Sequence, residues 1–403
     1  MTKSQVVYLS FDRFPSPKGA AVHIREFTRT LGQHFHSGVE LVTPNSSPEF
    51  VPQADPFVRG DVAHYELPAR GRTLIDRVLA FRRQILRFWG ERHERRGLPD
   101  IVHVRSIYEG YPIAREKERF TRYLVAEING LPSIELKYHY PDLAHDSALL
   151  TKLRAQEDLL LRQADLIIVV SAVTRDTLIE RGAAPERIRL IPNGVDGELF
   201  SYDEPRLEYG EPYRLLYTGT MTGWQGIQAA IDALQLLRRD HDATLSLVGP
   251  LRAHQRPAIE AQIERRGLED SVFLVDPVSQ DELAQIYGAH DITLAPLVSN
   301  DRNLVQGCCP LKVLEAMATG TPLVGSDLPV LQSLCKNGSE ALLVRPASPK
   351  AIKDGCLRLI EDPELSRAIA RNARERVERE FLWTHAARRL IDAYESLGVE
   401  SAL

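Results

Sequence analysis

The segment ADLIIVVSAVTRDTLIERGAAPERIRLIPNG, residues 164–194, holds the pattern that decides the fold: an apolar strand, a helix and a second apolar strand. The first run, residues 165–171, is β-branched and does not alternate, as expected of a strand that a parallel sheet buries on both faces. Ser171 then opens a helical pattern that Gly182 would end, because serine caps helix N-termini and glycine follows helix C-termini. The segment therefore predicts a βαβ unit.

The same alternation occurs on both sides of a polar segment at residues 197–212. The apolar runs lie at residues 5–11, 39–44, 100–106, 122–130, 165–171 and 188–194, and then at 213–219, 244–249, 272–278, 291–297, 321–327 and 341–346. Repeated strand–helix units are typical of a doubly wound parallel sheet, and a chain of 403 residues exceeds one ordinary core. We therefore predict an α/β fold with Rossmann-like domains at residues 1–196 and 213–380 and a linker at 197–212. Because such sheets bind ligands at the carboxyl ends of their strands, a cleft where the two domains face each other is the expected active site.

Composition and charge narrow the class of protein. The formal net charge of −5 gives no general indication of nucleic-acid binding. The four cysteines are a poor disulfide framework without zinc-like spacing: Cys308, Cys309, Cys335 and Cys356. No apolar stretch reaches the ~18 residues that a membrane span needs. We expect a cytoplasmic protein that is soluble or at most peripheral to the inner face of a membrane, with no metal and no nucleic-acid partner.

The segment GCCPLKVLEAMATGTPLVGSD, residues 307–327, is suited to anion binding. We expect Pro310 in the first turn of a helix that Gly320 ends, so that unpaired N–H groups and the positive end of the helix dipole face a ligand. Lys312 in that turn opposes the dipole unless an anion, such as a diphosphate, lies in front of it. Glu315, one turn later on nearly the same face, could accept hydrogen bonds from ribose hydroxyls. The alternative is an ordinary surface Lys–Glu pair.

The same region carries a resemblance to a known family. EAMATGTPLVGSD, residues 315–327, resembles the signature of the family 4 glycosyltransferases, which adopt the GT-B fold. Further segments are similar to parts of that family, strongly at 164–200, 217–234, 271–297 and 381–397, and more weakly at KGAAVHIREFTRTL (18–31) and DIVHVRS (100–106). The resemblance implies that a C-terminal helix within residues 381–403 returns to the N-terminal domain.

The resemblance also implies a nucleotide-sugar site. Its expected donor-binding residues are Lys18, Gly19, Gly219, Thr220, Gln225, Val275, Arg302, Gly307, Pro310, Leu311, Lys312 and Glu315. Glu315 aligns with the later glutamate of the family's paired-glutamate motif, which binds the donor ribose. The backbone at Pro310 and Leu311 would meet the β-phosphate, Gly19 would let the first loop approach the diphosphate, and residues 275–278 would line the base pocket.

The sequence departs from the family's pattern at three positions. The earlier glutamate of the paired motif is Gly307, and the usual arginine and lysine in the loop after the first donor-domain strand are Thr220 and Gln225. A diphosphate that leaves without metal assistance needs positive charge or aligned N–H groups. Three basic residues must then supply that charge: Lys18, Arg302 and Lys312. The chain is similar in this respect to a branch of the family with a Trp-Gln-Gly loop and a Pro-Leu-Lys helix start.

The N-terminal domain would hold the acceptor at its strand ends. His103 ends a strand where the family often has histidine, and it is either a catalytic-site residue or a side chain satisfied locally. Arg105 and Asn129 lie at similar strand ends. Glu127 points to the same side of its strand as Asn129, and it is either an acceptor contact or, the alternative that we favour, a buried and salt-bridged carboxylate.

The segment at residues 70–97 is strongly basic, with nine arginines and three acidic residues. Its apolar stripe has helical spacing and comprises Leu74, Val78, Phe81, Ile85 and Phe88, with Trp89 beside it. Such a helix can lie on a membrane surface. The alternative, which we favour, is a helix that packs its stripe on the sheet and leaves its arginines solvated.

Together with the resemblance, these features predict a retaining, metal-independent glycosyltransferase of polysaccharide or glycoconjugate biosynthesis. It would move a hexosyl group from a UDP- or GDP-linked sugar to a glycan, a glycolipid or a small molecule, without a cofactor. The family has no clear enzyme nucleophile, and the catalytic site would hold His103, Lys312 and Glu315, acting by position and charge. The alternatives are a partner subunit that has lost activity and another GT-B enzyme, such as a sugar-nucleotide epimerase.

Overall fold

The computed structural model describes residues 5–16, 18–35, 38–45, 62–206 and 209–399. The chain forms two compact units. The first comprises residues Met1–Ile191 and Ala386–Leu403, and the second comprises Pro192–His385. Each unit has one parallel sheet and its own buried apolar core.

The sheet of the first unit has seven parallel strands in the order β3-β2-β1-β4-β5-β6-β7. Their bounds are β1 Val6–Leu9, β2 Val39–Asn45, β3 Val62–Pro68, β4 Ile101–Val104, β5 Tyr123–Ile128, β6 Leu166–Val169 and β7 Ile188–Leu190. The strand order reverses direction between β1 and β4, so the carboxyl edge there is the topological switch point.

Strand β3 was absent from the sequence prediction. Its residues VAHYELP are mostly half-buried rather than fully buried, because β3 is the edge strand of the sheet. A search for continuously apolar runs therefore passes over it.

Helices cover the first sheet. Their bounds are α1 Gly19–His34, α2 Leu74–Arg96, α3 Ile107–Arg115, α4 Lys117–Phe120, α5 Pro132–His139, α6 Ser147–Gln163 and α7 Ala172–Glu180. The side chain of Ser171 accepts the backbone N–H of Thr174 at the start of α7, and Gly182 follows that helix with a φ of 89°. Both caps predicted from the sequence are thus confirmed.

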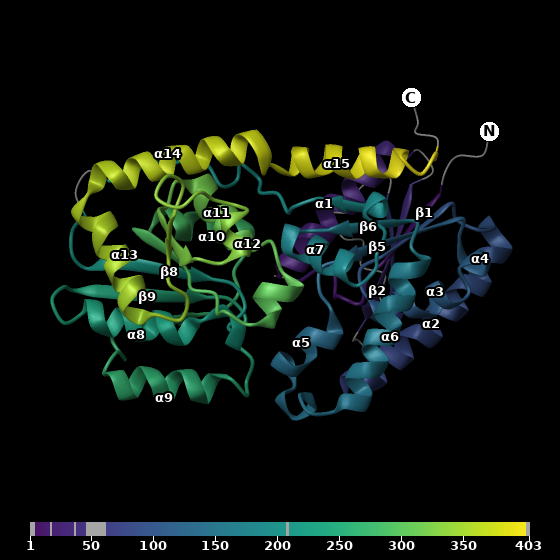
Figure 1. The fold of residues 1–403 in the computed structure, drawn as a ribbon, viewed down its shortest axis with the longest axis horizontal. Coiled ribbons are helices and arrows are strands. Elements are labelled where there is room, and N and C mark those ends of the chain that lie inside the picture. The colour runs from purple at the N-terminus through teal and green to yellow at the C-terminus, as the bar shows by residue number, and fades with distance from the viewer. Residues whose placement is uncertain (1–4, 17, 36–37, 46–61, 207–208, 400–403) are drawn as a thin grey trace. The chain divides into compact units, whose positions relative to one another are not determined.

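The sheet of the second unit has six parallel strands in the order β10-β9-β8-β11-β12-β13. The strands are β8 Tyr213–Thr218, β9 Ala243–Val248, β10 Val272–Val275, β11 Ile292–Ala295, β12 Leu323–Ser326 and β13 Leu342–Val344. The helices are α8 Ile227–Leu237, α9 Arg256–Arg266, α10 Gln280–Gly288, α11 Leu311–Thr319, α12 Pro329–Gln332, α13 Pro349–Glu361 and α14 Pro363–Glu380. In Figure 1, α8 and α9 lie on one side of strands β8 and β9, and α11 and α14 lie on the other. The predicted α/β class with two Rossmann-like parallel-sheet domains is confirmed.

The chain ends with α15, Trp383–Glu395. Residues from Ala386 onward belong to the first unit, and Tyr394 of this helix is fully buried there. Its hydroxyl lies 2.6 Å from Nδ1 of His103 on β4, so a hydrogen bond ties the last helix to the first sheet.

Helix α2 packs its predicted apolar stripe on the core. Phe81, Ile85 and Trp89 are buried in the core of the first unit, and Leu74 and Phe88 pack against it partly buried, as the packing alternative predicts. Val78 is buried as well. The prediction that the arginines are solvated is wrong for two of them. Arg82 donates to backbone oxygens of α3, and the buried Arg92 donates to Glu40, because both lie on the flank of α2 that faces the domain.

A second apolar row on α2 is exposed. Ile75, Leu79 and Leu86 have exposed fractions of 50%, 46% and 50%. Spacings of four and seven residues place all three on one side of the helix. This row is not evident from the sequence, because the longer buried stripe dominates the helical pattern.

Candidate active site

Lys312 is the charged centre of the predicted donor site. It lies in the first turn of α11, and it is 6% exposed. Its ammonium group donates to Oε1 of Gln225 at 2.9 Å and lies 3.7 Å from the centroid of the Tyr217 ring. The structure thus brings together α11, strand β8 and the loop that follows β8.

Gly219 is the residue that lets the loop after β8 pass close to Lys312. A Cβ atom at this position would lie 3.2 Å from Lys312 Nζ, and the glycine has a φ of 118°. Both the contact and the backbone angle disfavour a larger residue. The glycine predicted at the donor site therefore has a structural reason to be there.

No carboxylate of the described residues lies within salt-bridge distance of Lys312. Its partners, Gln225 and Tyr217, are a neutral amide and a ring face. Burial lowers the pKa of Lys312 to about 7, and the charges of Glu315 and Cys308 oppose that change only in part. A buried ammonium group without a paired anion is unfavourable, and an anionic ligand would relieve this state.

Glu315 is held from behind by a tyrosine. Tyr287 lies in the last turn of α10 and is fully buried. Its hydroxyl donates to Glu315 Oε2 at 3.0 Å. The same hydroxyl lies 2.8 Å from Oγ1 of Thr218 on β8. Burial raises the pKa of Glu315 to about 7, against the opposing effects of Tyr287 and Lys312. The carboxyl group is therefore fixed in orientation, as a group that binds ribose hydroxyls must be.

The N-terminus of α11 is open. Pro310 has extended backbone angles and is the N-cap residue, with no capping side-chain hydrogen bond. The prediction that it occupies the first helical turn is therefore wrong by one position, because its ψ of 118° is not helical. Proline has no N–H group, so the donors at this end belong to Leu311 and Lys312.

The loop before α11 is braced by Arg302. This residue begins the segment Arg302–Gln306, donates to the carbonyl oxygen of Gly307 at 2.6 Å and lies over the ring of Trp224. Gly307 has a φ of 77° and a ψ of 171°, a region that other residues avoid. The glutamate that the family has at this position would be strained in this loop conformation.

Thr220 follows strand β8, and Val275 is the last residue of strand β10. The carbonyl oxygen of Thr220 accepts the Tyr217 hydroxyl at 2.7 Å, and Val275 accepts the backbone N–H of Gly249. Lys18 and Gly19 belong to the first unit, where both are exposed at the N-terminus of α1.

In the first unit, Glu127 is the centre of a buried cluster. Its Oε2 accepts from the Tyr8 hydroxyl at 2.9 Å and lies 2.8 Å from His103 Nε2. Its Oε1 lies 2.8 Å from His23 Nε2, accepts from Arg105 Nε at 3.2 Å and accepts from the Asn129 amide. The favoured alternative for this glutamate, a buried and salt-bridged carboxylate, is the observed one.

The cluster fixes the protonation of its members. Burial opposes ionisation of Glu127, but His23 and Arg105 hold its pKa well below the usual value. Burial lowers the pKa of His103, which has no exposed surface and whose two ring nitrogens both contact hydrogen-bond partners. His103 is therefore a locally satisfied side chain in this structure, behind the strand ends rather than at the surface.

Several residues that build these sites were not singled out from the sequence: Tyr8, Asp12, His23, Asn193, Tyr217, Tyr287 and Tyr394. Asn193 begins the segment Asn-Gly-Val-Asp at residues 193–196. Its amide donates to the carbonyl oxygen of Cys309, just before α11. The resemblance covered this segment and could have indicated it. The tyrosines gave no signal, because buried aromatic residues are common in any core.

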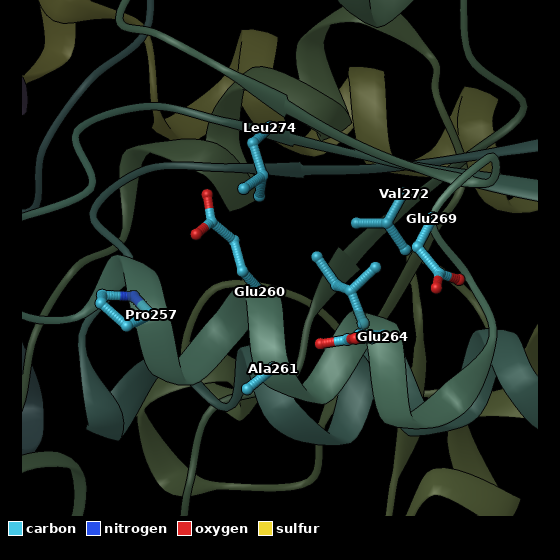
Figure 2. Close-up of a pocket in the computed structure, with 8 residues that line it drawn as sticks. Pro257, Glu260, Ala261, Glu264, Glu269, Val272 and Leu274 are labelled. Carbon is cyan, nitrogen blue, oxygen red and sulfur yellow. The ribbon is translucent and has the colours of Figure 1, made fainter.

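Neither of two further pockets is lined by a predicted donor or acceptor residue. The one of about 620 Å3 lies between α9 and the edge strand β10 (Figure 2) and is lined by Pro257, Glu260, Ala261, Ile263, Glu264, Glu269, Val272 and Leu274. The other, of about 460 Å3, lies between β3 and α2. Among the described residues, no group of three or more histidine, cysteine, aspartate or glutamate side chains is arranged to hold a metal ion. No helix in the described part of the chain has both the length and the apolar character needed to cross a bilayer.

Comparisons with known proteins agree with this geometry. A family model described as Glycosyltransferase Family 4 matches residues 17–199, and one described as Glycosyl transferases group 1 matches residues 212–362. Glycogen synthase from Mycobacterium tuberculosis is 27% identical over 297 residues, which are 73% of this chain and 68% of that protein.

Solved structures share the fold. Sucrose-phosphate synthase from Thermosynechococcus elongatus has a TM-score of 0.79 at 22% identity, over 98% of this chain and 99% of that chain. HepE from Anabaena, solved in complex with UDP-glucose, has a TM-score of 0.73 at 17% identity, over 97% of this chain and 99% of that chain.

The two Rossmann-like parallel-sheet domains have the GT-B fold, and the two family models identify the chain as a glycosyltransferase. The two family models together cover most of both units. The chain belongs to the family 4 glycosyltransferases.

Proposed function

We propose that the chain is a retaining, metal-independent hexosyltransferase that uses a nucleotide-diphosphate sugar. The observation that supports this proposal is the state of Lys312. It is a buried ammonium group with neutral partners, at the N-terminus of a helix whose first N–H groups are uncapped. A diphosphate bound there would supply the missing negative charge.

The same residues would assist departure of the diphosphate. Negative charge develops on the β-phosphate as the glycosidic bond breaks, and fixed donors that face this charge stabilise the transition state. Lys312 Nζ and the N–H groups of Leu311 and Lys312 would act in this way. Glu315, oriented by Tyr287, would hold the ribose and so position the sugar carbon relative to the acceptor.

For the donor, we propose UDP or GDP as the nucleotide, with UDP as the first to be tested, since HepE was solved with UDP-glucose. The test is a thermal shift of the wild-type protein with UDP, GDP, ADP and TDP, each with magnesium and with EDTA. A ligand at 100 times its Kd adds ~2.7 kcal/mol, which raises the midpoint measurably. A shift from one nucleotide in EDTA would support the proposal, and the absence of any shift would contradict it.

Retention of configuration is part of the proposal and needs its own measurement. No nucleophile is assigned, and the departing phosphate oxygen would take the acceptor proton on the same face of the sugar. The anomeric configuration of the product, followed by NMR from the first minutes of reaction, tests this step. The acceptor would be a glycan, a glycolipid or a small molecule.

A second candidate is a partner subunit that keeps the fold without activity. One observation favours it: Gly307, at the position of the family's earlier glutamate, has backbone angles that a glutamate would avoid. Donor hydrolysis by the purified chain would exclude this candidate, and product analysis would distinguish a transferase from a sugar-nucleotide epimerase.

We also propose that the exposed row on α2 contacts the inner face of a membrane when the acceptor is lipid-linked. Ile75, Leu79 and Leu86 are half-exposed on one side of the helix, and Arg83 and Arg87 beside Leu86 are exposed. Apolar side chains between arginines suit an anionic lipid surface. The four cysteines are free, in agreement with a cytoplasmic location.

A further inference from the structure

Three polar residues follow neighbouring strands at one edge of the first sheet. Asp12 follows β1, Arg105 follows β4 and Asn129 follows β5. This edge includes the switch point between β1 and β4, where open α/β sheets bind ligands. The three side chains are therefore at the position in this unit where a substrate is expected.

Arg105 connects the surface of this edge to the buried cluster. It is 6% exposed, and its Nε donates to Glu127 Oε1 at 3.2 Å while its Nη1 donates to Asp12 Oδ2 at 2.6 Å. Glu127 alone would neutralise the guanidinium group. The contact with Asp12 therefore does something else: it fixes a carboxylate whose side chain is 52% exposed.

The buried cluster fixes Arg105 in turn. Glu127 also contacts Tyr8, His23 and His103, and all three side chains are buried. Moving the guanidinium group would take a positive charge and a hydrogen-bond donor away from a buried carboxylate, which is costly. The Asp12–Arg105 pair thus differs from an ordinary surface ion pair, in which both side chains rotate freely.

The charges of this edge indicate which ligand it suits. Two carboxylates, Asp12 and Glu127, share one guanidinium group, so the formal charge of these three side chains is negative. An acceptor with a phosphate or carboxylate at this point would meet no excess of positive charge. Hydroxyl groups fit better, because they donate to Asp12 and accept from the Asn129 amide or from Arg105.

We propose that Asp12 is a hydroxyl-binding residue for a neutral sugar acceptor, and that Arg105 is the positioning residue that orients it from the buried Glu127 cluster. This inference rests on the proposed transferase function. Asp12 accepts hydrogen bonds from one hydroxyl or from two adjacent hydroxyls of the acceptor. The donor is bound by residues of the second unit.

The experiment compares Asp12→Asn and Arg105→Lys with wild-type enzyme. The control is Asp176→Asn, which removes the carboxylate of an exposed Asp–Arg pair on α7 of the same unit. Transfer is measured with UDP-glucose, or with whichever hexose donor binds. The acceptors are glucose, mannose, maltose and inositol, together with glucose 1-phosphate and glucose 6-phosphate. The shift of the thermal midpoint by the nucleotide reports donor binding and intact folding.

We expect the wild type to prefer neutral acceptors at least tenfold in kcat/KM over the phosphorylated ones. Asp12→Asn and Arg105→Lys should raise the acceptor KM about tenfold or more and change kcat less. Both variants should keep the thermal shift that the nucleotide causes. Asp176→Asn should change neither KM nor kcat. Three outcomes would each overturn the inference. The wild type could prefer the sugar phosphates, it could hydrolyse the donor but transfer to none of these sugars, or Asp12→Asn could leave the acceptor KM unchanged. Loss of both the nucleotide shift and donor hydrolysis in the wild type would instead refute the proposed function.

Discussion

Lys312 Nζ donates to Gln225 Oε1 at 2.9 Å, which gives this buried lysine a neutral hydrogen-bond partner. The family usually has a lysine at the position of Gln225, so this contact replaces two neighbouring positive charges with one charge and a hydrogen-bond acceptor. We therefore expect the proposed affinity for a diphosphate to depend strongly on the Lys312 side chain.

Replacing that side chain should separate binding of the diphosphate from binding of the nucleoside. Lys312→Met removes a charge-assisted hydrogen bond worth ~1.5–3 kcal/mol, so affinity for UDP should fall roughly 10- to 100-fold. Affinity for uridine should change little, as measured by calorimetry. Lys350→Met, at an exposed lysine paired with Asp354, is the control. Equal losses for UDP and uridine would remove Lys312 from the diphosphate site.

The Gln225 contact leads to an unusual expectation for a conservative change. Gln225→Glu places a carboxylate next to Lys312. This carboxylate would form an ion pair with the ammonium group and would repel the diphosphate. UDP affinity should fall at least about tenfold, whereas Gln225→Ala should reduce it only a few-fold. Calorimetric titrations of both variants check this order, and tighter binding to Gln225→Glu would show that Lys312 does not face the phosphates.

Glu315 should act on the nucleoside part of the ligand. Glu315→Ala removes the carboxyl group that would accept from the ribose, so affinity for UDP and for uridine should fall by similar factors, about tenfold. Tyr287→Phe keeps the carboxyl group and removes only the hydroxyl that orients it, and its effect should be smaller. Unchanged affinity of Glu315→Ala for uridine would exclude the ribose assignment.

Local pattern predicted most of the fold. All twelve apolar runs coincide with strands, including the edge strands β7, β10 and β13, because parallel strands covered on both faces read as uninterrupted apolar sequence. Strand β3 is not among these runs: it lies at an edge and keeps His64 and Glu66 in its sequence. Caps such as Ser171 were also predictable, since capping depends on neighbours three residues away.

The candidate site was predictable only where its residues lie in one helix. Lys312 and Glu315 share α11, and their spacing indicated a common face. By contrast, His103 was left with two alternatives because its partner Tyr394 is 291 residues away in sequence. Gln225 and Tyr287 likewise reach the site through tertiary packing, which spacing along the chain does not report.

The exposed row on α2 gives a prediction about membranes. A double variant, Leu79→Glu and Leu86→Glu, should reduce co-sedimentation with vesicles of phosphatidylcholine and phosphatidylglycerol severalfold, because it replaces apolar contact with negative charge. Ile179→Glu, at an exposed apolar residue of α7, is the matched control. Binding to pure phosphatidylcholine should be weak throughout. Equal sedimentation of the double variant and the wild type would exclude α2 as the contact surface.

The charges of Lys312 and Glu315 also predict how stability depends on pH in the nucleotide-free protein. Burial lowers the pKa of Lys312 from 10.5 to about 7, so between these values the unfolded chain binds more protons and stability should rise with pH. Burial raises the pKa of Glu315 from 4.5 to about 7, so between these values the folded chain binds more protons and stability should fall as pH rises.

Stability should therefore fall toward pH 7 because of Glu315 and rise above pH 7 because of Lys312, so the free energy of unfolding should have a minimum near pH 7. Lys312→Met should therefore raise the thermal midpoint of the free protein and flatten the rise in stability above pH 7, while Glu315→Gln should flatten the fall below it. Saturating UDP supplies an anion for Lys312, raises its pKa and should remove the minimum in the wild type, whereas Lys312→Met should show no such minimum with or without UDP. Thermal midpoints measured from pH 5 to pH 9 with and without UDP test this, and a midpoint that Lys312→Met lowers at pH 7 would show that the buried lysine stabilises the free protein instead.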